Sequence, residues 1–309
     1  MRPQRQRQHL IFCTSYPLDT YPEIHNTNCM AKYVPDIKTQ RWVVIAPTRN
    51  ARPADSAPVK PVCPFCVGNE AITPPEVYRI GSGEKDKEGW QVRVVPNLYP
   101  ITDIHEVIIH STDDEKNIGS LPLEQVSRIV TAYRDRYRAH QNDGQVMIFC
   151  NQGLHAGASL RHPHSQLVVV PKQIMLDSLV REPVNNIVEE NTYFITYCPD
   201  FSQWPYEVWI APKDLGTRFS DLTDLQIPDL ARVLQKALQK IEAIYKDPIS
   251  QPIHQDIPFG YNYYIYHGQD WYIRIIPRII HRAGFELGTG LNVNVVDPFE
   301  ATRQLKDLI

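Results

Sequence analysis

The densest group of polar side chains lies between Asn151 and Gln166, in the stretch NQGLHAGASLRHPHSQ. His162, His164 and Gln166 alternate along it, so on a strand their side chains would share one face. A neutral imidazole is a competent nucleophile toward phosphorus near pH 7, and an amide can donate to a phosphoryl oxygen. Ser159 and the N–H groups of the loop suit a phosphate. We therefore expect His164 to act as a nucleophile and Gln166 to stabilise the transferred group.

Two other interpretations of the histidines stay open. A pair of histidines beside a buried strand can simply belong to the core or to the surface. Alternate positions on a strand also suit chelation, so His162 and His164 together could bind a metal.

A second chemical motif is Cys63-Pro-Phe-Cys66, which has the spacing of half a tetrahedral zinc site. Two reduced structural thiols are one alternative. A redox dithiol is another, but such pairs usually open a helix after a strand, and a proline-rich stretch precedes this one. His162 is one candidate for a third ligand. The fourth would come from the segment HEVIIHSTDDEK, as one of His105, His110 and Asp114. We expect a bound Zn²⁺ ion.

Three further side chains suit a nucleotide. Arg49 and Arg52 are three apart on one short loop and could clamp a diphosphate. Asn97, in VPNLYP, could bind a ribose or a base. Each signal is weak by itself, because surface arginines are common and asparagine is frequent in turns.

The bulk composition is that of an ordinary globular protein. The 309 residues are 42% hydrophobic and carry a formal net charge of −3, so we expect no nucleic-acid partner. No apolar run approaches the roughly 18–20 residues of a membrane helix, and we expect no membrane partner. Of six cysteines only Cys63 and Cys66 are close in sequence, which indicates a reducing, cytoplasmic location. Residues 1–29 show no periodic pattern and indicate a disordered tail, or a start codon placed too far upstream.

Apolar patterning predicts many short strands and two helices. The helices are expected from Val126 to Tyr137 and from Ile227 to Ile244, with Pro122 and Pro228 near their starts. The expected strands are Trp42–Ile45, Val92–Val95, Glu106–Ile109, Val146–Cys150, Leu167–Val170, Tyr193–Tyr197, Val208–Ile210, Tyr263–Tyr266, Tyr272–Ile276 and Leu291–Val296.

The order strand, helix, strand, strand occurs twice along the chain. HEVIIHS, a helix, VMIFCN and HPHSQLVVVP are followed by YEVWIAP, a helix, YNYYIYH and DWYIRIIPR. We therefore expect an α+β fold of two related domains, 30–185 and 186–309, each an antiparallel sheet with packed helices. The second domain lacks the His-x-His-x-Gln pattern, so the chemistry should lie in the first. Chance similarity of two α+β segments is the alternative.

Seven motifs occur in the same order in one known family. They are RWVVIAPTRNARP, CPFCVGNE, VVPNLYP, HEVIIHS, GASLRHPHSQLVVVP, QWPYEVWIAPK and AGFELGTG. From about Tyr33 to the C-terminus the sequence resembles the galactose-1-phosphate uridylyltransferases, a branch of the histidine triad superfamily. The resemblance implies two tandem histidine-triad-like domains and a homodimer whose active sites are shared between subunits.

The resemblance also implies roles for single residues. His164 would take up the nucleotidyl group, and Gln166 would stabilise that intermediate. By the same matching, Asn151 and Ser159 would lie near the nucleotide phosphates, and Asn97 would contact the nucleoside. Arg49 and Arg52 would reach phosphate from the partner subunit.

The resemblance also implies a zinc site, with Cys63, Cys66 and His162 as ligands. Asp114 stands where the family often has a histidine as its fourth zinc ligand.

Two regions depart from the family pattern. The late strand reads Tyr272-Ile-Arg274, where some members have the His-x-His of a second metal site, so we expect no such site here. The segment from Gly284 to Gly290 differs from the hexose-recognition region of the galactose-specific members, which leaves the sugar open.

Three functions are compatible with these residues and motifs. The first is a UDP-glucose–hexose-1-phosphate uridylyltransferase that works by ping-pong transfer through uridylyl-His164. The second uses the same histidine with inorganic phosphate as the acceptor, in a nucleotide-sugar or dinucleotide phosphorylase, for example acting on ADP-glucose. The third is a non-catalytic nucleotide-binding protein.

Overall fold

The computed structural model describes residues 31–36, 41–51, 62–176, 179–255 and 257–308. Residues 1–29 and Arg52, for which the sequence suggested roles, lie outside the described residues.

Ten strands form one continuous sheet, and every strand pairs antiparallel with its neighbours. Their order across the sheet is β3-β4-β5-β7-β6-β11-β12-β10-β9-β8. The first half of the chain supplies β3 (Tyr78–Gly81), β4 (Trp90–Pro96), β5 (Ile104–Ile109), β6 (Gln145–Gln152) and β7 (His164–Val170). The second half supplies β8 (Ile187–Glu190), β9 (Phe194–Tyr197), β10 (Val208–Pro212), β11 (Tyr261–Ile265) and β12 (Ile273–Pro277).

The two halves of the sheet have the same topology. From each outer edge inward, the strands follow the order first, second, third, fifth, fourth of their half. The two fourth strands, β6 and β11, pair at the centre, where Asn151 lies opposite Asn262. The predicted α+β class with antiparallel sheets is confirmed, with the addition that the two sheets are hydrogen-bonded into one. The domain boundary at 185/186 stays a prediction.

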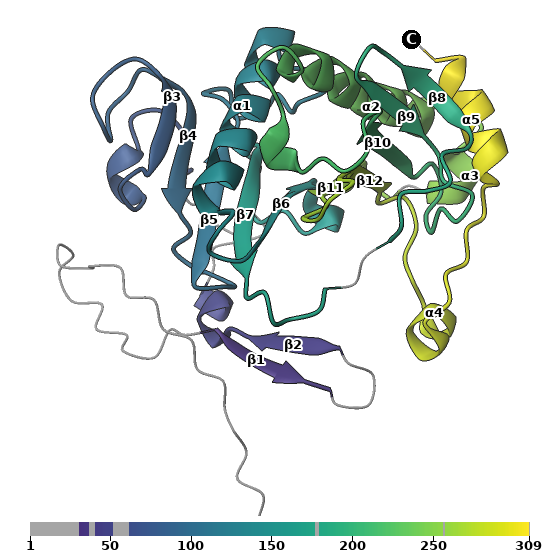
Figure 1. Cartoon of the computed structure of the whole chain (residues 1–309), viewed down its shortest axis with the longest axis horizontal. Coiled ribbons are helices and arrows are strands. Elements are labelled where there is room, and N and C mark those ends of the chain that lie inside the picture. Colours follow the sequence, from purple (N-terminus) through teal and green to yellow (C-terminus); the bar gives the residue numbers. More distant parts are fainter. Residues whose placement is uncertain (1–30, 37–40, 52–61, 177–178, 256, 309) are drawn as a thin grey trace, which may run out of the picture.

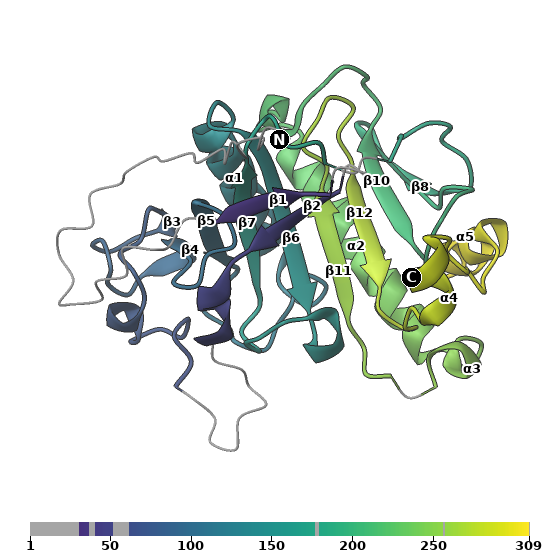
Figure 2. The same cartoon turned by 90° about the horizontal axis from the view of Figure 1, so that it is seen from below.

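Two long helices cover one face of this sheet (Figures 1 and 2). α1 (Leu123–His140) follows Pro122, and α2 (Ile227–Lys246) has proline in its first turn, as the sequence predicted. Each helix connects the third and fourth strands of its half. The shorter helices are α3 (Gln251–His254), α4 (Gly284–Thr289) and α5 (Pro298–Lys306).

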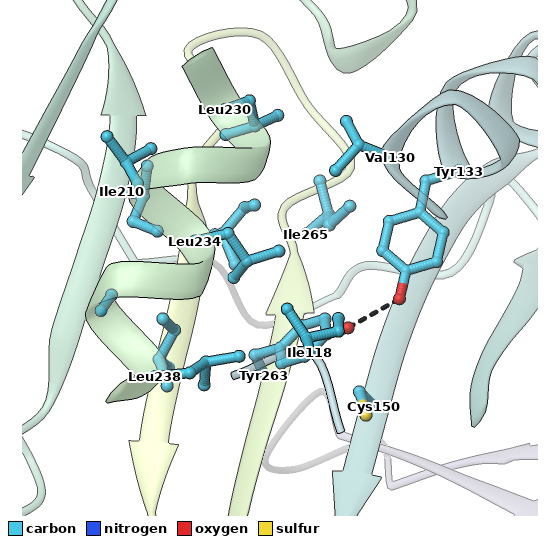
Figure 3. Close-up of a cluster of buried hydrophobic side chains, with 14 of the residues drawn as sticks. Ile118, Val130, Tyr133, Cys150, Ile210, Leu230, Leu234, Leu238, Tyr263 and Ile265 are labelled. Atoms are coloured by element: carbon cyan, nitrogen blue, oxygen red, sulfur yellow. Dashed lines mark hydrogen bonds between the residues drawn. The ribbon is translucent and has the colours of Figure 1, made fainter. Parts of the chain in front are cut away.

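A single hydrophobic core lies between the helices and the sheet and runs through both halves. Figure 3 shows Val130 of α1 and Leu234 of α2 beside Ile210 and Ile265 of the sheet. Because apolar side chains recur at helical spacing on α1 and α2 and at alternate positions on the strands, all of them can face this one layer. The core therefore unites the two halves.

The opposite face of the sheet carries different neighbours. A hairpin of β1 (Lys32–Pro35) and β2 (Trp42–Ile45) crosses this face in front of β7 and β6 (Figure 2). Helix α4 projects on the same side at the end of a long arm (Figure 1).

Among the described residues, no helix combines the length and the apolar character needed to span a bilayer.

One predicted strand is wrong. Leu291–Val296 forms no strand, although its apolar residues alternate. Leu291, Val293 and Val295 are all exposed, and the Asn294 side chain donates to the backbone of Ser202 and Trp204 instead of pairing in a ladder. The short strands β1, β3 and β8 were not predicted, and β3 and β8 lie at the two edges of the sheet.

A buried ion network joins α1 to β5. Glu106 of β5 accepts from Arg136 at 2.8 Å and contacts Nε2 of His140 at 2.9 Å. Nδ1 of His140 lies 2.9 Å from the Asp143 carboxylate. Burial lowers the pKa of His140, but the hydrogen bonds to Glu106 and Asp143 outweigh it, so the net pKa lies above the ordinary value.

The raised pKa of His140 predicts a pH-dependent stability. Protonated His140 contributes fully to the free energy of unfolding below about pH 6.5, the unfolded-state pKa, and this contribution is lost as pH rises through the folded-state pKa. Urea unfolding between pH 5.5 and 8.5 should show this decline in the wild type. His140→Gln should remove that part of the decline, and identical profiles for the two proteins would contradict the assignment.

Candidate active site

Strand β7 directs alternate side chains to opposite faces of the sheet. Leu167 and Val169 belong to the core beneath the helices, and Ser165 is fully buried on the same side. His164 and Gln166 lie on the other face and line a cavity of about 300 Å³. The cavity wall is largely apolar, and its other lining residues include Val62, Pro64, Phe65, Val95, Asn97, Leu98, Tyr99, Val107 and Ser159.

The His164 ring is fixed by one hydrogen bond and one aromatic contact. Nδ1 lies 2.8 Å from the carbonyl oxygen of His162, which can only accept, so Nδ1 carries the proton of the neutral ring. Nε2 is then the unprotonated nitrogen, which is the form that can attack an electrophile. The Phe65 ring meets the His164 ring edge-on, with centroids 5.2 Å apart. The arrangement defines both the tautomer and the orientation of the imidazole.

Gln166 is oriented by His105 on the neighbouring strand β5. Nδ1 of His105 accepts from the backbone N–H of Ile101 at 2.9 Å, so the neutral ring carries its proton on Nε2. That nitrogen lies 3.0 Å from Oε1 of Gln166 and 3.1 Å from Nδ2 of Asn97. Because the carboxamide oxygen of Gln166 is engaged, its NH₂ group is the part suited to a ligand oxygen in the cavity.

The loop after β6 completes the wall of the site. Gly153 has φ 90°, and a Cβ there would lie 2.8 Å from the carbonyl oxygen of Phe259, so the close approach requires glycine. The loop continues to Ser159, which lines the cavity beside His164. Asn151 lies near the end of β6, just before this loop, and its Oδ1 accepts from Nδ2 of Asn262 at 2.8 Å.

A second cluster lies beside the cavity and has the composition of a zinc site. Nδ1 of His162 lies 3.6 Å from Sγ of Cys63 and 3.7 Å from Sγ of Cys66. Nε2 of His162 lies 2.8 Å from the carbonyl oxygen of Ser111, so Nδ1 is the lone-pair nitrogen that faces the thiols. Two sulfurs and one imidazole nitrogen lie within 4.8 Å of one another, which fits a zinc ion. Metal-binding histidines commonly donate their other ring N–H to a backbone carbonyl, as His162 does to Ser111.

The two thiols of this cluster differ in acidity. Burial raises the pKa of Cys66 to about 12, and the hydrogen bond to Cys63 adds to the rise. Burial acts on Cys63 in the same direction, but hydrogen bonds with His162 and the Phe65 backbone lower the pKa of Cys63 below its ordinary value. Cys63 is therefore the thiol that more readily becomes the thiolate that zinc binds.

The structure places the three candidates for a fourth ligand apart from this cluster. The side chain of Asp114 is 45% exposed and lies 3.6 Å from Arg161, outside the group of ligand atoms within 4.8 Å. His105 holds Gln166, as described above. His110 contacts the Ser165 hydroxyl at 2.8 Å and the Tyr133 hydroxyl at 3.0 Å in the core. The expectation that His105 or His110 completes the cluster is therefore wrong, and Asp114 as a ligand stays a prediction.

The predicted phosphate residues are only partly described. Arg49 donates to the backbone carbonyl of Tyr99 of the same chain at 2.8 Å, and Tyr99 lines the cavity. This places the 3₁₀ turn Pro47–Ala51, which follows the β1–β2 hairpin, at the edge of the site. Arg52 lies outside the described residues. The roles of Arg49, Asn97, Asn151 and Ser159 toward a ligand stay predictions.

Comparisons with known proteins identify the family to which this chain is related. The model of the family described as "Galactose-1-phosphate uridyl transferase, N-terminal domain" matches residues 101–171, which run from the start of β5 to the end of β7. The chain is a relative of the galactose-1-phosphate uridylyltransferases. The resemblance predicted from the motifs is thereby confirmed.

Two curated relatives cover most of the chain. One is an ADP-glucose phosphorylase of Arabidopsis thaliana, 28% identical over 88% of this chain and 92% of the relative. The other is a galactose-1-phosphate uridylyltransferase of Thermotoga maritima, 25% identical over 87% of this chain and 96% of the relative. These relatives of the uridylyltransferase family catalyse different reactions, so the likeness alone does not select the substrate.

Solved structures give the same picture of the fold. The crystal structure of an Arabidopsis thaliana ADP-glucose phosphorylase with bound ADP-glucose has a TM-score of 0.68 and 26% identity, covering 90% of this chain and 99% of that one. A uridylyltransferase structure has a TM-score of 0.68 at 21% identity, covering 89% and 97%. The second comparison supports the fold only.

The cysteine–histidine cluster predicts about one tightly bound zinc per chain. Cys63→Ser should remove most of the metal found by elemental analysis, because a hydroxyl is a poor zinc ligand. A chelator should lower the melting temperature of the wild type and leave that of the variant nearly unchanged. Asp114→Asn tests the fourth ligand, and Arg161→Gln, which removes the cation paired with Asp114 and Glu115, is the matched control. Full zinc content in Cys63→Ser would contradict the site.

Proposed function

We propose that this protein is a nucleotidyltransferase that takes a nucleotidyl group from a nucleoside diphosphate hexose onto Nε2 of His164. The observation that supports this best is the state of the His164 ring, whose Nδ1 proton is held by the His162 carbonyl at 2.8 Å beside a cavity shared with Gln166 and Ser159. An imidazole held in one tautomer at a cavity wall meets the geometric demand on a nucleophile.

In the first half-reaction, Nε2 of His164 would attack the α-phosphorus. A P–N bond forms, the P–O bond to the sugar phosphate breaks, and hexose 1-phosphate leaves. The ring becomes positively charged as the bond forms, and the His162 carbonyl stabilises this charge through the proton on Nδ1. The Gln166 NH₂ group would donate to a phosphoryl oxygen, where donors of this kind typically contribute about 10²–10³-fold in rate.

In the second half-reaction, an oxygen of the acceptor phosphate would attack the same phosphorus. The P–N bond breaks, and His164 leaves as the neutral imidazole with its proton still on Nδ1. Cys63, Cys66 and His162 would hold zinc, which when bound supplies a structural cross-link. Phe65, between the two cysteines, packs on His164 and so links that loop to the nucleophile.

Two reactions are candidates for this chemistry. The first is uridylyl transfer from UDP-glucose to a hexose 1-phosphate, which the motifs, the family match at residues 101–171 and the Thermotoga maritima relative support. The second is phosphorolysis of ADP-glucose, which the Arabidopsis thaliana relative supports at 28% identity over 88% of the chain. The apolar cavity wall suits a nucleobase of either kind.

The central test is covalent labelling. Protein incubated with UDP-glucose or ADP-glucose carrying radioactive α-phosphate should acquire an acid-labile, base-stable label. His164→Ala should acquire none, and His267→Ala, a histidine on the β11–β12 loop at the far end of the sheet, serves as the matched control. The nucleotide that labels, and the acceptor that then releases the label, identify the reaction. Nucleotide binding without any label would favour the non-catalytic interpretation.

We also propose a homodimer. Val43 and Ile45 of the β1–β2 hairpin are 57% and 42% exposed, and Phe285 and Leu287 of α4 are 54% and 79% exposed. A lone two-stranded hairpin is marginally stable, so a partner surface would explain these apolar side chains. Sedimentation should give twice the mass of the chain, and Val43→Asp with Ile45→Asp should shift the protein to the monomer. A monomeric wild type at micromolar concentration would exclude the dimer.

A further inference from the structure

Two arginines from the second half of the chain lie just after β12, three strands from β7 in the sheet. Arg278 follows β12, and Arg282 lies four residues later. Both guanidinium groups stack on the indole of Trp204, with Cζ 5.0 Å and 4.5 Å from the ring centroid. Stacking on one aromatic ring holds the two positive charges near each other.

No carboxylate neutralises this pair in the described part of the chain. The neighbouring Arg274 is paired with Glu207 at 2.7 Å, whereas Arg278 and Arg282 form no ion pair there. Among the described residues, the Arg282 guanidinium donates to the Gln203 carboxamide oxygen at 3.3 Å. The neighbouring His281 ring lies 6.1 Å from that of His155, on the loop that follows β6.

Arg278 also has an unused donor. Its Nε is buried and has no hydrogen-bond partner among the described residues. Burial, followed by the charge of Arg282, lowers the pKa of Arg278. A buried donor without a partner costs free energy, and so do two like charges held together, and an anion between the guanidinium groups would relieve both costs.

The pair is connected to the nucleophile across the sheet. Nη1 of Arg278 donates to Oδ1 of Asn262 at 2.9 Å. Nδ2 of Asn262 in turn donates to Oδ1 of Asn151 and to the carbonyl oxygen of Ala156, both at 2.8 Å. Asn262 lies opposite Asn151 on β6 and opposite Ile276 on β12.

These connections place the arginines on the side of the site occupied by β11 and β12 (Figure 2). From β7 to β12 there are three steps between strands, or roughly 14 Å at about 4.8 Å each. The Arg278 side chain reaches back to Asn262 on β11, which is one of these steps. An anion held by the pair would therefore lie beside the Gly153–Ser159 loop and within reach of a nucleotidyl group on His164.

The geometry points to Arg278 and Arg282 as the binding site for the phosphate group of the acceptor in the second half-reaction. This inference rests on the proposed nucleotidyl transfer. The ligand is a phosphate dianion, from inorganic phosphate or from a sugar phosphate. Two guanidinium groups suit its tetrahedral oxygens better than a single ammonium group, since each presents planar, paired donors.

The decisive experiment measures release of the label from isolated, nucleotidylated protein. The release rate is followed against the concentration of inorganic phosphate, and in a second series against glucose 1-phosphate. Arg278→Gln and Arg282→Gln should each raise the half-saturating concentration of the active acceptor by about tenfold, the size of one lost charged hydrogen bond. Arg278→Lys should recover part of the loss. Arg303→Gln, on α5, is the matched control and should match the wild type.

Arg278→Gln also removes the hydrogen bond to Asn262, so its effect could reflect a shifted loop. Arg282→Gln avoids this, because Arg282 forms no hydrogen bond with Asn262 in the described part of the chain. Acceptor dependence that is unchanged in both glutamine variants would overturn the inference. The acceptor that releases the label shows whether inorganic phosphate or a sugar phosphate is the source.

A binding measurement separates this inference from the proposed function. Calorimetric titration of unlabelled protein with sodium phosphate should show binding that both glutamine variants weaken about tenfold. If no nucleotide sugar labels the wild type, the proposed function fails, and this titration alone decides the inference. Binding lost in the variants would support the phosphate site, and equal or absent binding in all proteins would overturn it.

Discussion

The hydrogen-bonded pairing of β7 along both of its edges fixes the geometry of the site. β5 pairs with one edge and β6 with the other, so neither the register nor the facing of β7 can shift without moving its neighbours. Leu167 and Val169 are held in the core, which leaves His164 and Gln166 on the open face. The same pairing brings His105 of β5 to Gln166 and Asn151 of β6 beside the start of β7.

Much of this arrangement follows from local sequence patterns. Alternation along HPHSQLVVV predicts which side chains face the cavity, and helical spacing predicts α1 and α2. Contacts between distant segments are harder to predict. His105 binds Gln166 only because β5 and β7 are neighbours, and Phe65 reaches His164 only because the cysteine loop folds over the strand. Leu291–Val296 alternates like a strand but pairs with no other strand. Alternation predicts which side chains would share a face, and it does not predict whether a partner strand is present.

The duplicated topology does not duplicate the candidate site. On the open face of the second half, the Trp209 and Tyr272 rings stack with centroids 4.0 Å apart, and the Arg274–Glu207 pair is buried beside them. The hydroxyl of Tyr272 donates to the carbonyl oxygen of Leu179, in the segment that connects the halves. Aromatic packing and the connecting segment therefore fill the space where the first half has its cavity.

The central pairing of β6 with β11 also limits how the molecule can move. The two halves share one sheet and one core, so they cannot close on a ligand by a hinge motion between them. Bending at the β6–β11 pair would break backbone hydrogen bonds and open the packed core beneath the sheet. Any shielding of the cavity from bulk water must then come from segments laid over the open face, such as the β1–β2 hairpin (Figure 2). Evolution of new specificity on this scaffold is accordingly expected to act on those covering segments, while the two-lobed platform stays constant.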